Sequence, residues 1–387
     1  MPLFKKNKFH FIFLFYVELL FSQQFPSVHY STLEGLPNNS VYSILKDSRG
    51  VLWVGTANGL SAVQNGSIQN YYTTDGLAHN SCWAIAEDGN HNLWFGSYGG
   101  GLSFYDGKKF QIINTKKGLV NDQIRTLFVH GKYLYVGTQY GFSVVDVASR
   151  KVVYSDKIKG EKGLFQVMSF YVQDAQVCFA TFDDGIWSVN VSKKSMQFEN
   201  HEIPHIFSVF PAQSNFYFSH IDIDNGFFNQ ISIYDSKNRL SKRFRSNTIL
   251  WDYAIDKSGI VYGAGNGVNF SSGGIYELTT HGLIDQTTAF GIPSFSVWSL
   301  EYDIKQDLLY VGTLDKGLYI IDLKKQINHY SASTFKKEKL EVVKMARLDS
   351  KQLVLSKDEL LFLNQHKIDN AIAKKTLFDF ILRYKLI

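Results

Sequence analysis

The sequence predicts an all-β fold, a β-propeller of four-stranded blades, and three observations support this class. A segment of roughly 42 residues recurs along the chain, and a period of about 40–45 residues is typical of a propeller blade. The repeats are rich in Val, Ile, Tyr, Phe and Trp and alternate in polarity, which favours strands over the helices of a helical solenoid. Aromatic residues make up 15% of the 387 residues, with 30 Gly and only 6 Pro, a balance that suits short strands joined by tight turns. Seven blades are favoured, with eight as the alternative.

The repeats are clearest in the first third of the chain. Each opens with Gly-Leu, a few polar residues and the start of a strand, at residues 35–44, 76–85 and 118–127. A second signature, Leu-aromatic-x-Gly-Thr or -Ser, follows at residues 52–56, 93–97 and 134–138. Later copies are degenerate but stay in phase, at residues 178–181, 217–220, 262–264 and 310–313, with an eighth candidate at 354–356.

Four strands, A to D, can be placed inside the first repeat, with strand A innermost. We expect them over residues 40–47, 51–56, 59–64 and 67–73. Gly55 and its counterparts are expected to let neighbouring backbones approach closely. Trp53 and Trp94 occupy the same position in two repeats, and packing between blades is favoured there over a ligand platform.

The N-terminal residues 1–22 have the pattern of a secretory signal peptide. Lys5, Lys6 and Lys8 precede the apolar run 9–21, which is shorter than the roughly 20 apolar residues of a membrane-spanning helix. An uncleaved membrane anchor and a buried element of the domain are the alternatives. We therefore expect an exported, periplasmic protein with no membrane span in the mature chain.

Charge and cysteine content exclude several classes of protein. The formal net charge is +5, but residues 1–22 carry +2, residues 23–323 carry −4 and residues 324–387 carry +7. A mildly acidic central region lacks the basic patch of nucleic-acid-binding proteins, so no nucleic-acid partner is expected. Two Cys residues exclude a disulfide scaffold, and Cys82 and Cys178 are expected to be buried thiols rather than a bridge.

The domain organisation depends on how the ring closes. Residues 23–335 are assigned to the propeller, and residues 336–387 to an eighth repeat or to the start of a truncated second propeller. Segment 28–31 resembles segment 328–331, and both look like strand D. Segment 28–31 could then complete an eighth blade, whose strands A to C would be residues 341–347, 352–356 and 360–364. Seven blades followed by a stub are favoured.

The motif Leu-Trp-x-Gly-Thr-x-x-Gly-Leu, together with Gly-Leu-x-x-Asn-x-aromatic, resembles the two-component regulator propeller repeat. The resemblance is strong over residues 35–145 and weaker to residue 330. It implies the periplasmic sensor region of hybrid two-component systems, many of which sense glycans. Family members usually add a second propeller, an immunoglobulin-like domain, a transmembrane helix and a histidine kinase. This chain shows one propeller's worth of repeats and no kinase motif, so we expect a truncated product, a fragment or a stand-alone propeller.

Aligning the repeats gives a candidate ligand site at one rim of the ring. Five repeats carry an aromatic residue or Arg early in strand A: Tyr42, Trp83, Arg125, Trp251 and Trp298. Strand A begins at the rim shared by the D–A and B–C loops, so these side chains could ring the channel mouth, offering stacking faces and a carboxylate-binding Arg. Polar neighbours in the same loops are Asn39, Asn58, Asn80, Asp122 and Asp184. The alternative is that the strand-A side chains pack between blades.

No catalytic residues, metal site or cofactor are predicted. Residues 47–53 resemble a sialidase-type Asp box but carry an extra residue before the Gly, and a turn is favoured. Residues 222–226 have acidic spacing without the distal Glu of a calcium loop, and a polar loop is favoured. The expected function is therefore non-enzymatic sensing of a carbohydrate-like ligand. The alternatives are a protein-interaction scaffold, with a protein partner or a homodimer formed through propeller faces, and, less favoured, a propeller lyase or glycosidase.

Overall fold

The computed structural model describes most of residues 25–325 and four strands further along the chain. Within the first part, the stretches not described are residues 158–165, 201–202, 204, 213, 224–227, 238, 268–271 and 280. The predicted signal peptide, segment 328–331 and most of the acidic loop 222–226 therefore lie outside the described residues. The chain divides into two compact units, residues 1–326 and 327–387, which are treated separately.

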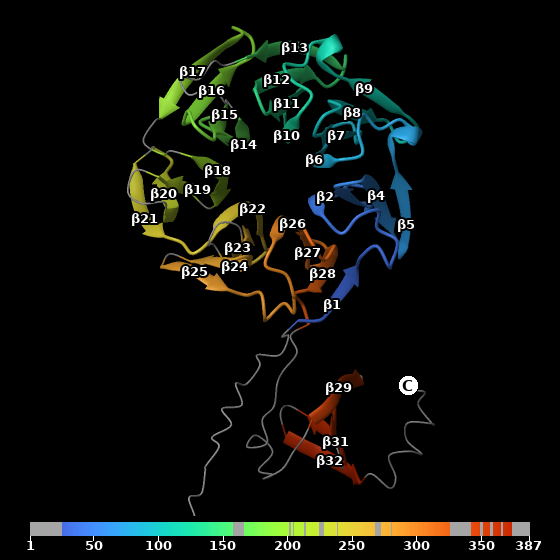
Figure 1. Cartoon of the computed structure of the whole chain (residues 1–387). Helices are drawn as coiled ribbons and strands as arrows, with labels where there is room; N and C mark the ends of the chain where they lie inside the picture. The colour runs from blue at the N-terminus through green and yellow to red at the C-terminus, as the bar shows by residue number, and fades with distance from the viewer. Residues whose placement is uncertain are drawn as a thin grey trace, which may run out of the picture. The chain divides into compact units, whose positions relative to one another are not determined.

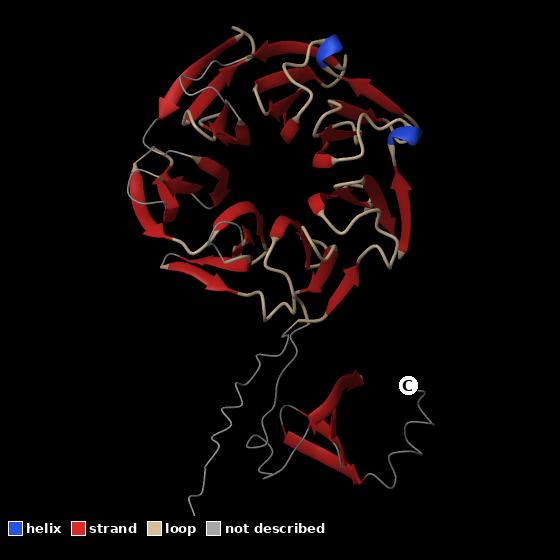
Figure 2. Ribbon diagram, viewed as in Figure 1, coloured by secondary structure: helices blue, strands red, loops and turns tan. Residues whose placement is uncertain are grey.

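The first unit is a propeller of seven four-stranded antiparallel blades arranged in a ring (Figures 1 and 2). Blades 1 to 3 consist of β2 (Val41–Lys46), β3 (Leu52–Thr56), β4 (Gly59–Gln64), β5 (Ser67–Tyr71); β6 (Cys82–Glu87), β7 (Leu93–Ser97), β8 (Leu102–Tyr105), β9 (Phe110–Ile113); and β10 (Ile124–His130), β11 (Tyr133–Thr138), β12 (Gly141–Asp146), β13 (Lys151–Asp156). Blades 4 to 6 consist of β14 (Val167–Gln173), β15 (Gln176–Thr181), β16 (Ile186–Asn190), β17 (Ser195–Asn200); β18 (Ile206–Ala212), β19 (Asn215–Asp222), β20 (Phe228–Asp235), β21 (Leu240–Arg245); and β22 (Ile249–Ile255), β23 (Val261–Asn266), β24 (Gly274–Thr279), β25 (Gly282–Asp285). The predicted class and the favoured blade number are confirmed.

Blade 7 closes the ring with strands from both ends of the propeller. It contains β26 (Val297–Asp303), β27 (Leu308–Thr313), β28 (Leu318–Asp322) and the N-terminal β1 (Ser27–Tyr30). β1 pairs antiparallel with β28, with Val28 opposite Ile320. The idea that segment 28–31 completes an eighth blade is therefore wrong. Pairing β1 with β28 gives blade 7 its fourth strand, so no blade of the ring is left incomplete with an extra exposed edge.

Neighbouring blades approach closely at the Gly of the Leu-Trp-x-Gly-Thr motif. A Cβ atom on Gly55 would lie 2.3 Å from Ser43 Oγ in the same blade and 2.7 Å from the backbone oxygen of Cys82 in blade 2. Gly96 is similar, because its Cβ would lie 2.5 Å from Ile124 Cγ2 in blade 3. Real Cβ contacts are longer, so only Gly fits without a shift, and the predicted close approach is confirmed.

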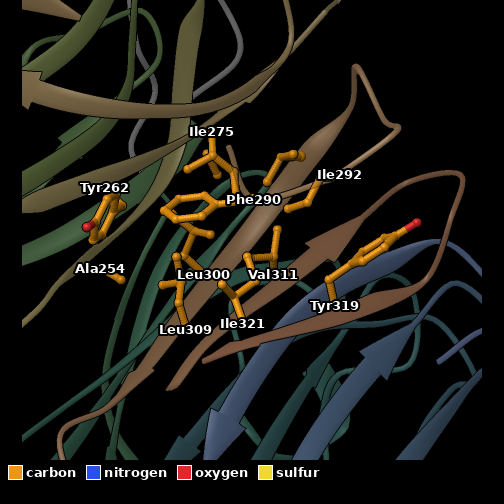
Figure 3. Packing of buried hydrophobic residues seen from close by; sticks show 12 residues of the cluster. Ala254, Tyr262, Ile275, Phe290, Ile292, Leu300, Leu309, Val311, Tyr319 and Ile321 are labelled. Atoms are coloured by element: carbon orange, nitrogen blue, oxygen red, sulfur yellow. The ribbon is translucent and has the colours of Figure 1, made fainter. Parts of the chain in front are cut away.

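Large apolar side chains fill the remaining space between blades. Figure 3 shows the core between blades 6 and 7, where Tyr262 and Ile275 meet Leu300 and Val311. Alternate residues of the central strands point into such layers, as expected for sheets packed face to face. Cys82 and Cys178 are free, buried thiols in different cores, which confirms that prediction.

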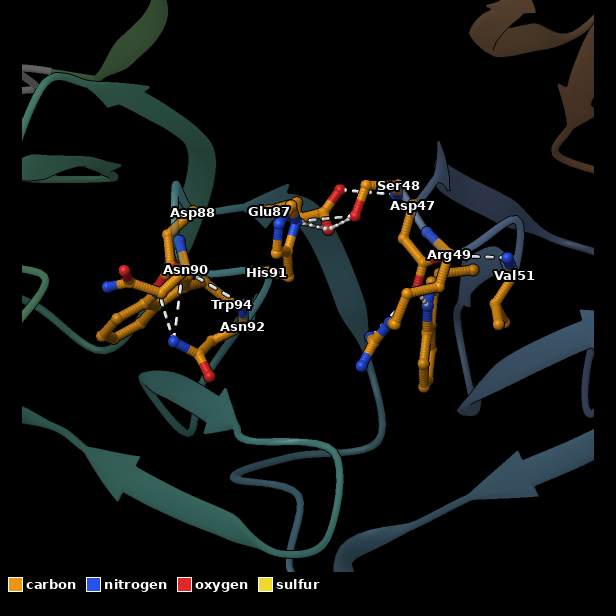
Figure 4. Close-up of polar contacts among 11 residues, drawn as sticks. Asp47, Ser48, Arg49, Val51, Glu87, Asp88, Asn90, His91, Asn92 and Trp94 are labelled. Carbon is orange, nitrogen blue, oxygen red and sulfur yellow. Dashed lines mark hydrogen bonds and ion pairs between the residues drawn. The ribbon is translucent and has the colours of Figure 1, made fainter. Parts of the chain in front are cut away.

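The motif Trp residues of blades 1 and 2 are buried and fastened to the A–B turn of their own blade. Trp53 is 3% exposed and Trp94 is fully buried. The indole N–H of Trp53 donates to Asp47 Oδ2 at 3.0 Å, and that of Trp94 donates to Asp88 Oδ2 at 2.8 Å (Figure 4). Asp47 Oδ1 also accepts the backbone N–H of Val51 at 2.8 Å. The Asp therefore serves the turn and the core, and the packing role predicted for Trp53 and Trp94 is confirmed.

The second unit contains one four-stranded antiparallel sheet. Its strands are β29 (Val342–Leu348), β30 (Lys351–Ser356), β31 (Glu359–Asn364) and β32 (Lys367–Ala373), paired in chain order. The register of the β29–β30 pair shifts between Val342 and Lys344. The first three strands lie where the sequence places strands A to C of an additional repeat. Across the described parts of both units, no helix is long and apolar enough to cross a membrane.

Candidate functional site

All seven innermost strands of the ring carry a β-bulge at the same position. In each blade the register against the second strand skips one residue near the start of the innermost strand. The seven skipped residues are Tyr42, Trp83, Arg125, Met168, Phe207, Trp251 and Trp298. A bulge re-aims a side chain, and all seven line a single cavity in the central channel.

The five predicted residues of strand A are therefore brought together, and sequence reasoning missed Met168 and Phe207. Both follow a buried aliphatic residue at the start of strand A, Val167 and Ile206, just as Tyr42 follows Val41. That pair of a buried aliphatic residue and a bulged residue was the signal available. It was obscured because the Leu-Trp-x-Gly-Thr motif is degenerate in blades 4 and 5.

Aromatic rings form a continuous contact chain around much of the channel mouth. Trp251 stacks on Trp298, with ring centroids 4.2 Å apart, and contacts Phe207 edge-on at 4.9 Å. Tyr42 lies 4.7 Å from Trp83 and 6.2 Å from Trp298. These side chains are half-buried, so each keeps part of its surface open to the channel. The ring thus presents several aromatic surfaces around one axis.

Arg125 is the single charged member of this ring of seven. Its Nε donates to Gln139 Oε1 at 2.8 Å, and its guanidinium lies 5.6 Å from the ring centroid of Trp83 and 6.0 Å from that of Tyr98. Desolvation lowers the pKa of Arg125 from its ordinary value, although an Arg remains charged at neutral pH. Among the described residues, no carboxylate pairs with it.

The cavity behind the ring has a volume of about 480 Å³ and two acidic side chains in its wall. Asp252 accepts the backbone N–H of Leu300 at 2.9 Å, and Glu301 accepts the backbone N–H of Lys46, so each bridges to the next blade. The side chains of Asp252 and Glu301 line the channel cavity and are half-buried. Protein atoms nevertheless surround both carboxyl groups and keep most water away from them. Desolvation raises the pKa of Asp252 to about 7 and that of Glu301 to about 8.

The predicted polar loop residues mainly brace the rim. Asn39 Oδ1, Asn80 Oδ1 and Asp122 Oδ1 each accept the backbone N–H of a Thr seven residues earlier, at 2.8 to 2.9 Å. Asn80 Nδ2 donates to Asn58 Oδ1 at 3.2 Å. Asp184 takes part through its backbone, whose N–H donates to the Thr181 hydroxyl and whose carbonyl accepts the Trp187 indole N–H. Their loops hold the ring in place, whereas the channel cavity is lined by the bulged strands.

The side chains of the site offer surfaces and a charge to which a small molecule could bind. The described residues hold no group of three or more His, Cys, Asp or Glu side chains that could bind a metal ion. Asp252 and Glu301 are occupied with backbone N–H groups of the following blades. Aromatic surfaces, one cation and a cavity of about 480 Å³ are features of a small-molecule site.

Two stretches of the chain, residues 35–58 and 76–99, match the family model described as the two component regulator propeller. The resemblance inferred from the repeats is confirmed there. No curated protein matches the chain.

Three solved structures illustrate the fold similarity. The extracellular domain of the putative hybrid two component system BT3049 from B. thetaiotaomicron is 16% identical, with a TM-score of 0.67, over 90% of this chain and 49% of that one. The extracellular domain of the putative one component system BT4673 from the same organism is 17% identical, with a TM-score of 0.58, over 91% and 47%. PorZ, a surface component of the type-IX secretion system of Porphyromonas gingivalis, is 10% identical, with a TM-score of 0.54, over 92% and 47%. This chain spans about half the length of these structures.

Proposed function

We propose that the ring is an exported sensor module that binds a carbohydrate-like ligand at the aromatic mouth of its channel. One observation carries the proposal: the same bulge in all seven blades directs one side chain each to the channel, and five of these side chains are aromatic. A bulge leaves one residue of the ladder unpaired, so seven of them at one site favour a built binding surface over accidental packing.

The chemistry of the mouth supports a sugar. Sugar rings present C–H faces that stack on aromatic side chains, and Tyr42, Trp83 and Trp298 offer such faces within 6.2 Å of one another. The cavity of about 480 Å³ lies within the range of small-molecule sites. The extracellular domains among the structural neighbours support export, and the two stretches that match the regulator propeller support a sensor role.

Isothermal calorimetry of the full chain against a panel of oligosaccharides tests the proposal, with Trp83→Ala and Trp298→Ala as variants. We expect each substitution to weaken binding about tenfold, or about 1.4 kcal/mol, because a stacking face is lost. Leu240→Ala is the matched control, since Leu240 is an exposed apolar residue on the outer strand β21. Unchanged binding in both Trp variants would contradict the site.

A protein-interaction scaffold is the second candidate. Leu33 and Phe295 are 92% and 77% exposed and lie in D–A loops, at the same rim as the aromatic ring. Exposed apolar side chains at one rim favour a protein partner there. A partner would depend on these two side chains and not on the channel cavity.

A further inference from the structure

The charge of Arg125 is not balanced inside the protein. Its side chain is half-buried at the channel mouth, and desolvation is the main influence on its pKa. A desolvated cation is normally paired with an anion, since leaving it alone costs free energy. The surroundings supply the faces of Trp83 and Tyr98 and the carbonyl of Gln139 instead.

The guanidinium is held in a defined orientation. Gln139 is 8% exposed, and its Oε1 accepts both Arg125 Nε at 2.8 Å and the Tyr98 hydroxyl at 3.3 Å. This occupies Nε, while Nη1 lies 3.9 Å from the sulfur of Met168, a weak acceptor, and the Tyr98 hydroxyl is a further hydrogen-bonding neighbour of the guanidinium. A guanidinium has five N–H donors, so the terminal nitrogens keep donors for two oxygens of one planar group.

The opposite wall of the channel carries two carboxyl groups. Arg125 lies on β10, and Asp252 and Glu301 lie on β22 and β26, across the channel from it in Figure 1. Burial raises the pKa of Asp252 to about 7 and that of Glu301 to about 8, so this wall is largely uncharged at neutral pH. Among the residues that line the cavity, Arg125 carries the one positive charge, so an anionic group of a ligand is attracted to the β10 wall.

We infer that Arg125 binds an oxyanion group of the ligand, and that the ligand is an acidic sugar carrying a carboxylate, a uronate. The inference rests on the proposed function, because the aromatic surfaces would stack the same sugar. A carboxylate matches the planar guanidinium through two parallel N–H···O bonds, whereas a neutral hydroxyl leaves the charge unbalanced. A sulfate ester shares the oxyanion chemistry, and the experiment separates the two.

A glycan array with uronate-bearing, sulfate-bearing and neutral oligosaccharides, probed with the full chain, is the first measurement. Binding confined to uronate glycans supports the inference, and binding confined to sulfated glycans overturns the carboxylate assignment. Binding to neutral glycans alone overturns the inference and leaves the proposed function standing. Binding to none overturns both.

Calorimetry then separates recognition from packing, using a uronate glycan bound on the array and the same glycan methyl-esterified. We expect Arg125→Gln to weaken the uronate about tenfold or more and to leave the ester nearly unchanged, because only the uronate pairs with the charge. Arg125→Lys should recover part of the loss. Equal weakening of uronate and ester would mean that Arg125 only shapes the ring, which overturns the inference.

Discussion

Blade 2 and blade 4 have the same four-stranded topology but hold it with different side chains. Blade 2 has Trp94 fastened to Asp88 and a Gly, Gly96, at the close approach to blade 3. Blade 4 has Cys178 at the Trp position and Ala180 at the Gly position, both buried. Yet both innermost strands keep the bulge, at Trp83 and Met168.

The regular early blades and the degenerate later blades differ in the same way: the packing side chains change, whereas the bulge stays. In blade 5 the Gly position holds Ser219, whose hydroxyl accepts the backbone N–H of Leu250 in blade 6 at 2.9 Å. A small side chain there replaces a steric fit with a hydrogen bond between blades. In blade 4 the bulge of the innermost strand persists at Met168. The B–C turn of blade 4 persists too, since Thr181 Oγ1 still donates to the carbonyl of Gly185 at 2.9 Å. The features nearest the channel are thus kept more strictly than those of the packing layers.

The largest effect is expected from Asp88→Asn in blade 2. The Asp88 carboxylate accepts the indole N–H of fully buried Trp94 and the backbone N–H groups of Asn90 and Asn92. An Asn side chain would turn one N–H donor against another in either orientation, at a cost of about 3 kcal/mol. Chemical denaturation measures the loss in the free energy of unfolding.

The matched control is Asp174→Asn in the A–B turn of blade 4, where the Asp side chain is exposed. Its backbone has φ of 49°, which Asn tolerates as well as Asp. A change within about 0.5 kcal/mol is expected for such an exposed substitution. Equal losses of unfolding free energy in the two variants would show that the contact of Asp88 with Trp94 does not distinguish blade 2 from blade 4.

A smaller effect is expected from Gly55→Ala. Its new Cβ would contact the backbone oxygen of Cys82 at 2.7 Å, so blade 2 must shift, at about 2 kcal/mol. Gly89→Ala is the control, because no atom lies within 4 Å of its Cβ. Thermal unfolding should separate the two variants, and a Gly55→Ala protein as stable as Gly89→Ala would refute the role given to the close approach.

The smallest effect is a pH dependence from blades 6 and 7. Asp252 and Glu301 have pKa values raised to about 7 and about 8, so the folded state binds more protons than the unfolded state from about pH 4 upward. Stability therefore falls as pH rises through this window. Melting temperatures between pH 6.5 and about 7.5, below the range where Cys thiols ionise, should show the fall.

The double variant Asp252→Asn with Glu301→Gln should flatten this slope, whatever its absolute stability. The window starts above pH 6.5 because burial lowers the pKa of His220 to about 4, which acts in the opposite direction on the acid side. Asp252 sets blade 6 apart, because the residue after the bulge is Ser or Ala in blades 1, 2, 4, 5 and 7, and Thr in blade 3. An unchanged dependence of the melting temperature on pH would show that Asp252 and Glu301 do not cause it.

The blade phase and five of the seven ring residues could be predicted because each repeat signals its own hairpins locally. Gly55 and Trp53 were also interpretable, since steric fit and burial follow from residue type. Met168 and Phe207 were missed because the Leu-Trp-x-Gly-Thr motif of their blades is degenerate, so strand A of those blades could not be aligned residue by residue. The roles of Asn39, Asn80 and Asp122 as loop braces depend on hydrogen bonds between residues seven apart, which a motif does not specify.

The sequence by itself determined the propeller class, the preference for seven blades and the place of strand A, because these depend on periodicity and local turn chemistry. Only the tertiary structure decided that β1 closes blade 7, that every innermost strand bulges, and that Asp252 and Glu301 lie across the channel from Arg125. The bulges lie between neighbouring strands of one blade, but that all seven line one cavity depends on the closed ring. The closure of blade 7 and the placement across the channel join residues from about a hundred to almost three hundred positions apart, and no local pattern encodes which distant partners will meet.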